Sequence, residues 1–572
     1  MTTALLLCLL PLVGEPPAYF PAAATPTESL LPADTIAMAT MPSAAKFRSR
    51  WNVSSFGVMA ADPAFGPFFD DVRTRIETLS RTLGFDVQSV WNAADGELSL
   101  GLTRGEERRF TLVGIANFDA DESAAAALID RLERQLAAAG SQRAAVEADT
   151  RTLVSWTNPS DRSQSLAYYR QDGHVVFADR LPALVQLASR ESTDREVSET
   201  LGGSEAYQKV KSQTRPAQEA AAIRWYVNPA AAVDAVLTDG LRNNPNLNVV
   251  RGLLEQSGIN QFRGFGGLFD LPGTTLDSVS STYGYVEGEP RGLLKALAMP
   301  ASPQRPPRWV KDDVSLYSQM NWSPGQLVDV VRSAVDSMRG EGTFEATIAS
   351  QPLAGDVTAG ELLAQFDGPL HFAAEVPQSA EDLTRQATII SLGIKDAAAT
   401  AALLQRLAGE TPATTVGDAT IYTLDMPFDV PAGTPLESLR SPQLAVTVAE
   451  GQLMLSTDGA YLERTVAGIG SGRALVDSPE YREIAQNFPE QTAVINFQRQ
   501  DERFEGMYEQ LRAGGMPAVG TLGVAASVLG FDFTKLPPFP AMSRYLQNTG
   551  GYIVPAEDGF RVVNFSLEPR ER

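Results

Sequence analysis

The second half of this chain repeats the first at an offset of about 270 residues, and this repetition limits the possible folds more than any other feature. The blocks that match occur in the same order in both halves. They are Asp34–Met38 with Asp313–Tyr317, Asp95–Leu100 with Asp367–Phe372, Thr111–Ile115 with Thr388–Leu392, Ala127–Leu132 with Ala402–Leu407, Asp172–Phe177 with Glu450–Leu455, Ser204–Tyr207 with Ser478–Tyr481, Ala222–Tyr226 with Ala493–Phe497, and Gly284–Val286 with Gly551–Ile553. This order indicates an internal duplication.

The pattern inside each half predicts the fold class. Strands with alternating apolar and polar residues are interspersed with Ala- and Leu-rich amphipathic segments, and the alternation is typical of antiparallel strands with one covered face. Within a half we expect the order strand, helix, strand pair, helix, hairpin, helix, strand, helix, strand. The prediction is therefore α+β, as two tandem copies of a mixed, mostly antiparallel sheet-and-helix domain.

Four segments follow from these patterns. We predict a signal peptide over residues 1–24, a first α+β repeat over 25–300, a Pro-rich linker over 301–309 and a second α+β repeat over 310–572. The joint between the halves reads PASPQRPPRW from Pro300 to Trp309, and so many prolines should make it a stiff, extended connector.

The N-terminus predicts export. Residues Ala4–Val13 form an apolar run of the length that a signal peptide uses, and small residues follow at Ala22–Ala24, although no Lys or Arg precedes Lys46. Cys8 is the only cysteine of the chain. Cleavage would leave no thiol, which is compatible with an oxidising compartment. We therefore expect a secreted or periplasmic protein without a transmembrane span after cleavage.

The charge excludes some partners. The chain has 572 residues and a formal net charge of −22, which would repel nucleic acid and anionic membrane surfaces. The long uncharged stretch after the signal, Met516–Phe531, contains three glycines and is shorter than a spanning helix. We interpret it as a buried helical hairpin.

Two motifs resemble sites but are better explained by helix starts. Ser43 and Lys46 fit the S-x-x-K pattern of penicillin-recognising enzymes, yet the matching position in the second half is Ser323, followed by a proline and by Gln326, which could close a capping box. Residues Asp119–Asp130 resemble a calcium loop, but alanine stands where the turn needs glycine. We predict an N-cap at Ser43 and acidic residues that complement a helix dipole at Asp119–Glu122.

The two histidines and one glycine-rich segment give no stronger signal. His174 and His371 are the only histidines, each within a predicted strand, and we expect both side chains to be exposed. Gly468–Arg473 has an arginine where a dinucleotide loop needs its third glycine, so we interpret it as a helix C-terminus. The sequence therefore predicts no catalytic, cofactor-binding or metal-binding residues and no cofactor.

The start of the predicted mature chain resembles a known family. Leu31–Thr35 read LPADT, and Ala61–Phe65 carry a "DPA" segment before a helix. These residues, within Leu31–Leu79, resemble a family of exported bacterial proteins of unknown function. The resemblance implies a secreted or periplasmic α+β protein, and the family supplies no catalytic residues.

Three functions stay open. The first is an exported, non-enzymatic scaffold whose two halves bind an unknown envelope component or protein partner, with the region between the halves as the place for a ligand. The second is a binder of an apolar or lipidic ligand that uses the apolar segment Pro517–Phe531. The third is an exported hydrolase that acts through a pair of carboxylates in one cleft.

Overall fold

The structure is a computed structural model, and it describes residues 26–83, 87–104, 110–118, 122–148, 151–171, 173–192, 199–214, 222–234, 258–273, 275–296, 298–354, 356–375, 387–425, 443–500, 505–514 and 532–569. The predicted signal peptide lies outside these ranges. Among the described residues, no helix has both the length and the apolar character needed to cross a membrane.

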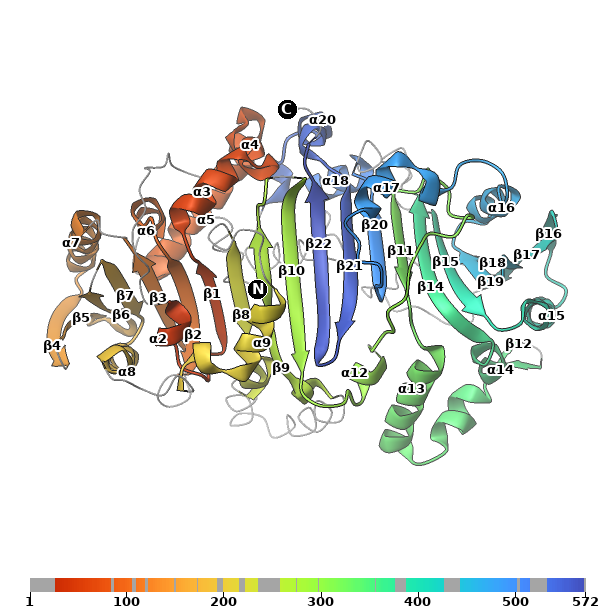
Figure 1. Cartoon of the computed structure of the whole chain (residues 1–572), viewed down its shortest axis with the longest axis horizontal. Helices are drawn as coiled ribbons and strands as arrows, with labels where there is room; N and C mark the ends of the chain where they lie inside the picture. The colour runs from red at the N-terminus through yellow and green to blue at the C-terminus, as the bar shows by residue number, and fades with distance from the viewer. Residues whose placement is uncertain are drawn as a thin grey trace.

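Twenty strands of the described residues form one antiparallel sheet with two open ends, which runs along the long axis of the molecule (Figure 1). The strands of the N-terminal section are β1 (Ala37–Met41), β2 (Leu98–Arg104), β3 (Phe110–Asn117), β4 (Gln142–Ala148), β5 (Arg151–Asn158), β6 (Asp161–Gln171), β7 (His174–Ala178), β8 (Ile223–Val227), β9 (Phe262–Asp270) and β10 (Leu276–Val286). Those of the C-terminal section are β11 (Leu316–Met320), β14 (Phe366–Glu375), β15 (Ala387–Ile394), β16 (Ala413–Val416), β17 (Ala419–Asp425), β18 (Gln443–Ala449), β19 (Gln452–Ser456), β20 (Val494–Gln498), β21 (Thr549–Ala556) and β22 (Gly559–Leu567). A separate small sheet pairs β12 (Pro352–Ala354) with β13 (Val357–Thr358).

The two sections pair their strands in the same order. From its outer edge inward, the N-terminal section runs β4, β5, β6, β7, β3, β2, β1, β8, β9, β10. The C-terminal section runs β16, β17, β18, β19, β15, β14, β11, β20, β21, β22. Strand β10 pairs with β22, so the innermost strands of the two sections meet and make one sheet.

Helices cover both faces of the sheet. The N-terminal section contains α2 (Thr27–Leu30), α3 (Ala44–Val53), α4 (Ser55–Ala61), α5 (Gly66–Leu83), α6 (Val87–Ala93), α7 (Glu122–Ala138), α8 (Leu181–Ser192), α9 (Glu205–Gln213) and α12 (Leu293–Ala296). The C-terminal section contains α13 (Pro324–Arg339), α14 (Ala359–Leu363), α15 (Ala397–Ala408), α16 (Gly459–Ala467), α17 (Pro479–Ala485), α18 (Glu505–Arg512) and α20 (Phe539–Met542). In Figure 1, α9 and α17 lie in front of the central strands, one low and one high. Side chains of α3, α6 and α7 form one core with the opposite face.

Glycines let α9 and α17 approach the sheet at corresponding places. Gly266 of β9 lies beneath Val210 of α9, and a methyl group added there would lie 2.9 Å from that side chain. Gly550 of β21 lies beneath Ile484 of α17 in the same way, at 2.6 Å. The two glycines occupy matching positions. Gly266 is opposite Tyr226 and Gly550 is opposite Phe497 in the neighbouring strands, and Tyr226 and Phe497 end matching blocks of the two halves. The absence of a side chain at these two positions therefore sets the distance between helix and sheet.

The structure corrects the sequence prediction in three places while confirming the mixed helix-and-strand content and the mostly antiparallel pairing. The expected order omitted β4, β5 and β9 in the N-terminal section and β16, β17 and β22 in the C-terminal section. The match of Thr111–Ile115 with Thr388–Leu392 is one residue out of register. Ser99 and His371 match each other, and their partners in the neighbouring strands are Ile115 and Ser391, whereas the sequence match pairs Ile115 with Leu392. A slip of one residue in a strand turns every side chain to the other face. The last match is also wrong, because Gly284 lies in β10 whereas Gly551 lies in β21.

Candidate functional site

The place where the two sections meet is the best-defined feature that could bind a partner. Strands β10 and β22 are paired from Ser278 opposite Ser566 to Tyr285 opposite Gly559. The hydroxyl groups of Ser278 and Ser566 are hydrogen-bonded at 2.7 Å. We call this pair of strands the seam, and in Figure 1 it lies in the middle of the sheet.

A patch of neutral polar side chains extends from the seam over the neighbouring strands. Since alternate residues of a strand, and residues opposite each other in paired strands, share a face, the register defines the patch. One row contains Ser278, Ser566, Thr549 and Gln498, and the next contains Ser280, Asn564, Asn496 and Ser318, with Gly551 between the two asparagines. We call these eight side chains the central polar patch. They face away from α9 and α17, because Gly266 and Gly550 point to the other face.

The central polar patch is accessible and uncharged. The side chains of Asn496 and Asn564 are exposed, and that of Ser278 is buried. The other five side chains are half-buried. Hydroxyl and carboxamide groups can both donate and accept hydrogen bonds. In a chain with a net charge of −22, an uncharged patch of this kind can bind a neutral polar ligand without a charge partner.

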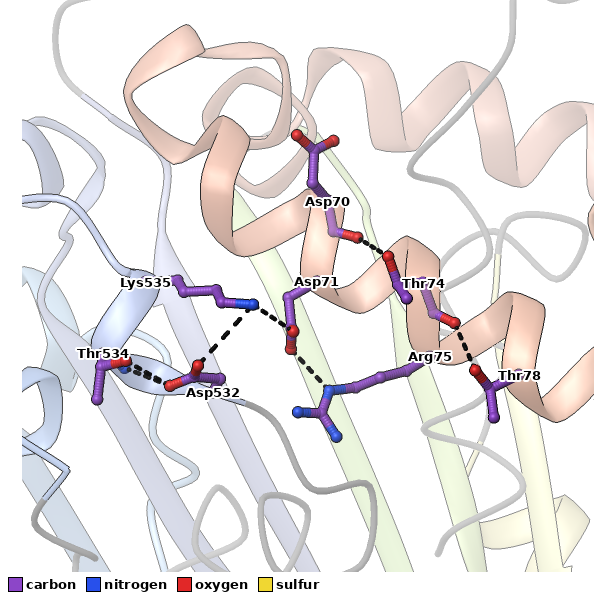
Figure 2. A network of polar contacts seen from close by, with 8 residues as sticks. All are labelled: Asp70, Asp71, Thr74, Arg75, Thr78, Asp532, Thr534 and Lys535. Atoms are coloured by element: carbon purple, nitrogen blue, oxygen red, sulfur yellow. Dashed lines mark hydrogen bonds and ion pairs between the residues drawn. The ribbon is translucent and has the colours of Figure 1, made fainter.

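An ion-pair cluster joins the two sections beside the seam (Figure 2). Asp71 of α5 contacts two cations, Lys535 Nζ at 2.6 Å and Arg75 Nε at 2.6 Å. Lys535 belongs to a 3-10 helix, η13 (Phe533–Lys535), of the C-terminal section. Burial alone would raise the pKa of Asp71, but the hydrogen bonds from Lys535 and Arg75 outweigh it and lower that pKa. The carboxylate therefore remains charged through the neutral and mildly acidic range.

A second contact lies a few residues away and uses the "DPA" segment. Asp62 accepts a hydrogen bond from the Ala64 amide at 2.9 Å, which starts the 3-10 helix η2 (Pro63–Phe65). The same carboxylate accepts from the hydroxyl of Tyr545 at 2.7 Å and pairs with Arg544 at 3.1 Å. The ring of Phe65 packs edge-on against Tyr545, with centroids 5.8 Å apart. Together with Asp71 and Lys535, these residues form what we call the clasp, which ties the start of α5 to the C-terminal section.

A small pocket of about 110 Å³ opens at the end of the seam. It is lined by Arg50, Val53, Ser54, Leu271, Gly273 and Asp277 from the N-terminal section and by Glu568 from the C-terminal section. Asp277 is buried, and its Oδ1 accepts a hydrogen bond from the Ser55 amide at 2.9 Å. The pocket therefore brings two carboxylates and one guanidinium together where the sections meet.

The predicted helix starts are confirmed in part. Ser43 is the N-cap of α3, and its hydroxyl accepts from the Lys46 amide at 3.3 Å, so the S-x-x-K pattern is a cap. Ser323 precedes α13 with proline at the first turn, but its side chain makes no cap hydrogen bond, and the expected capping box with Gln326 is wrong. A capping box occurs instead at Thr358 and Glu361, at the start of α14.

The prediction that both histidines are exposed is wrong. His371 is 2 % exposed and His174 is 6 % exposed. The ring of His371 stacks on Tyr317, with centroids 6.2 Å apart, and meets Trp309 edge-on at 6.1 Å. Its Nδ1 lies 2.9 Å from the Tyr317 hydroxyl. His371 is buried because the segment before β11 places Trp309 over this part of the sheet.

The remaining candidate residues are not gathered into a site. Asp119–Asp121 lie outside the described residues, and Asp130 is exposed on α7. The described residues contain no group of three or more His, Cys, Asp or Glu side chains that could hold a metal ion. Gly468 caps the end of α16, and Gly470 and Gly472 have positive φ, which confirms a helix C-terminus there. The predicted apolar hairpin Met516–Phe531 lies outside the described residues.

The central polar patch has no simple signal in the sequence. Its residues come from five strands of both sections, and only the register aligns them. One signal was available: β10 reads Ser278, Ser280 and Thr282 at alternate positions, where a covered strand would carry apolar residues. This alternation indicates a strand face in contact with water or with a polar ligand.

Comparison with known proteins adds a family match for part of the chain. A family model described as a protein of unknown function (DUF3352) matches residues 16–222, from before α2 to the start of β8. This range contains Leu31–Leu79, on which the resemblance rests. No curated protein and no solved structure matches the chain.

Proposed function

We propose that this chain is an exported, non-enzymatic scaffold of the cell envelope, secreted or periplasmic, which binds an envelope component on the central polar patch. We further propose that its two sections arose by internal duplication. The observation that carries the proposal is the seam, because it joins two sections of the same strand order into one continuous surface.

The pairing at the seam supports duplication. Gly266 and Gly550 occupy matching positions, and their partners in the next strand are Tyr283 and Phe565. Tyr283 and Phe565 are therefore equivalent, and two residues earlier in each strand come Ser281 and Val563. These two are opposite each other in the seam. A residue that pairs with its own equivalent marks a two-fold axis, the arrangement of a symmetric homodimer. The sections would thus be a dimer fused into one chain.

The chemistry of the central polar patch suggests the ligand class. Hydroxyl and carboxamide side chains on a broad strand surface match the neutral hydroxyl and amide groups of a glycan chain. The patch crosses five strands, and neighbouring strands lie about 4.8 Å apart, so it extends over about 20 Å. That length suits several sugar units of an extended polymer. We therefore propose that the envelope component is a glycan, with peptidoglycan as the probe.

The experiment measures co-sedimentation of the purified chain with peptidoglycan sacculi. The double variant Asn496→Ala/Asn564→Ala removes the two exposed carboxamides of the central polar patch. We expect it to weaken binding roughly tenfold, since each lost hydrogen bond contributes about 0.5–1.5 kcal/mol. Asn52→Ala is the matched control, because Asn52 is an exposed asparagine on α3. Absence of wild-type binding, or equal binding by the double variant, would contradict the proposal.

Export has its own test. Residues 1–40 are fused to alkaline phosphatase, which is active only after export, and enzyme activity is measured in whole cells. We expect activity, and we expect Leu6→Arg/Leu9→Arg to abolish it, because two charges interrupt the apolar run of the signal. A fusion that is inactive although the protein accumulates would show that the predicted signal does not direct export.

One observation favours a second candidate, an exported hydrolase. Asp277 and Glu568 line one pocket, as a pair of catalytic carboxylates would. Among the described residues, Asp179 is the carboxyl group whose pKa is raised, because burial outweighs its hydrogen bonds, and it follows β7 outside this pocket. Release of soluble fragments from sacculi by wild type, and its loss in Glu568→Gln, would favour this candidate over the scaffold.

A further inference from the structure

Strand β4 forms one end of the sheet and lies at the left of Figure 1. In the described part of the chain it pairs on one side only, with β5. Six of its seven residues are exposed. A strand edge of this kind presents backbone N–H and C=O groups that can pair with another strand. We propose that two copies of this chain associate through β4, which pairs antiparallel with β4 of the second copy.

The sequence of β4 complements itself in one register. When the antiparallel pair is centred on Ala145, Arg143 lies opposite Glu147 of the second copy. Because the arrangement has two-fold symmetry, the same contact occurs twice. Opposite charges at directly opposed positions stabilise an antiparallel pair, whereas like charges there destabilise it. The charges on β4 therefore select this register.

The other side of β4 is complementary as well. In the same register, Ala144 lies opposite Val146 of the second copy, again twice. Val146 is 41 % exposed. Pairing would cover it with an alanine side chain and with the backbone of the second copy. Apolar contacts would thus form on one face of the joined sheet while ion pairs form on the other.

The contacts that these residues already make are compatible with the proposal. Arg143 Nε lies 3.0 Å from Glu133 Oε1, and the Arg143 side chain remains 47 % exposed. Glu147 accepts from the hydroxyl of Thr152 at 2.8 Å. A guanidinium has five N–H donors and a carboxylate about four acceptor sites, so each group can take a further partner.

The opposite end of the sheet is less suitable for pairing. Strand β16 has four residues, Ala413–Val416, and none of them is charged. Pairing of β4 with β16 of another copy would leave Arg143 and Glu147 without opposite charges and would produce an open filament. The charge pattern therefore predicts a closed dimer through β4.

The experiment is analytical ultracentrifugation of the full chain over a range of micromolar concentrations. We expect a monomer–dimer equilibrium for the wild type. Arg143→Glu and Glu147→Arg should each weaken the dimer roughly tenfold or more, because each replaces two attractive contacts by two repulsive ones. The double variant Arg143→Glu/Glu147→Arg should restore it, since the opposed charges are exchanged. Arg73→Glu, a charge reversal at an exposed side chain of α5, should leave the dimer unchanged.

Each possible result decides the question. Restoration by the double variant cannot come from misfolding of a single variant, and circular dichroism of each variant gives an independent check of the fold. A monomeric wild type, single variants that dimerise normally, or a double variant that stays monomeric would overturn the proposal. Assemblies that grow beyond the dimer would favour the β4–β16 filament instead. The inference does not depend on the proposed function.

Discussion

His371 should make the fold less stable as the pH falls below neutrality. Its ring is buried between Tyr317 and Trp309, and its Nε2 has no hydrogen-bond partner among the described residues. Burial lowers the pKa of His371 from its ordinary 6.5 to about 4. The folded protein therefore holds this ring neutral at a pH where the unfolded chain would bind a proton.

The magnitude follows from these two pKa values. About one pH unit above 6.5 the ring is almost entirely neutral in both states, and it has almost no effect on the pH dependence. As the pH falls, the unfolded chain binds the proton first, so the free energy of unfolding decreases. The decrease is about 2 kcal/mol between pH 7.5 and pH 5, and it levels off at about 3 kcal/mol below pH 4.

The assay is urea unfolding at pH 7.5 and at pH 5.0, followed by circular dichroism. Wild type should lose about 2 kcal/mol more than His371→Gln between the two conditions, because glutamine keeps a polar side chain and does not titrate. Asn52→Gln, a change of a non-titrating side chain at an exposed position of α3, is the control and should keep the wild-type loss. Equal losses in wild type and His371→Gln would refute the reasoning.

Three more predictions concern stability, each measured by urea unfolding at pH 7.5. In the clasp, Asp71→Asn and Lys535→Met should each cost about 1 kcal/mol, and a double-mutant cycle should give a coupling of about 0.5–1 kcal/mol; additive effects would show that the pair does not interact. Gly266→Ala should cost about 1–3 kcal/mol, because the added methyl group would lie 2.5 Å from a backbone oxygen of β8. Gly325→Ala on α13 is its control and should be neutral or stabilising, since nothing lies within 4 Å, and equal costs would contradict the packing argument. Arg48→Met should cost about 2–3 kcal/mol, because its guanidinium is buried and bonds two backbone carbonyls at 2.6 and 2.9 Å; a cost below about 1 kcal/mol would mean that these bonds are replaceable.

Local patterns in the sequence predicted what depends on local physics. The N-cap at Ser43, the helix end at Gly468 and the antiparallel strands each follow from a few neighbouring residues, and the structure confirms them. Strand β4 was missed because its residues are exposed on both faces, so it shows no apolar and polar alternation. The burial of His371 was missed because it depends on Trp309, which lies more than sixty residues earlier in the chain.

The sequence did not predict the candidate site, because the site also depends on contacts between distant residues. The seam pairs Ser281 with Val563, and no local pattern reports a contact over that separation. The central polar patch exists only because this pairing aligns strands of both sections. A one-residue error, such as the one made for Thr111–Ile115, would assign the patch to the wrong face.

The most direct test of the account is a disulfide across the seam, because the scaffold requires that the two sections share one sheet. The native Cys8 is replaced by serine, and two variants are compared, Ser281→Cys/Val563→Cys and Thr282→Cys/Val562→Cys. Directly opposed pairs of an antiparallel ladder alternate between closer and wider spacing, so one of these adjacent pairs has the closer spacing. We predict that mild oxidation cross-links at least one variant within a single chain, detected as a shift in electrophoretic mobility that reduction reverses. Failure of both variants to cross-link in the folded protein would contradict the seam, and with it the single binding surface.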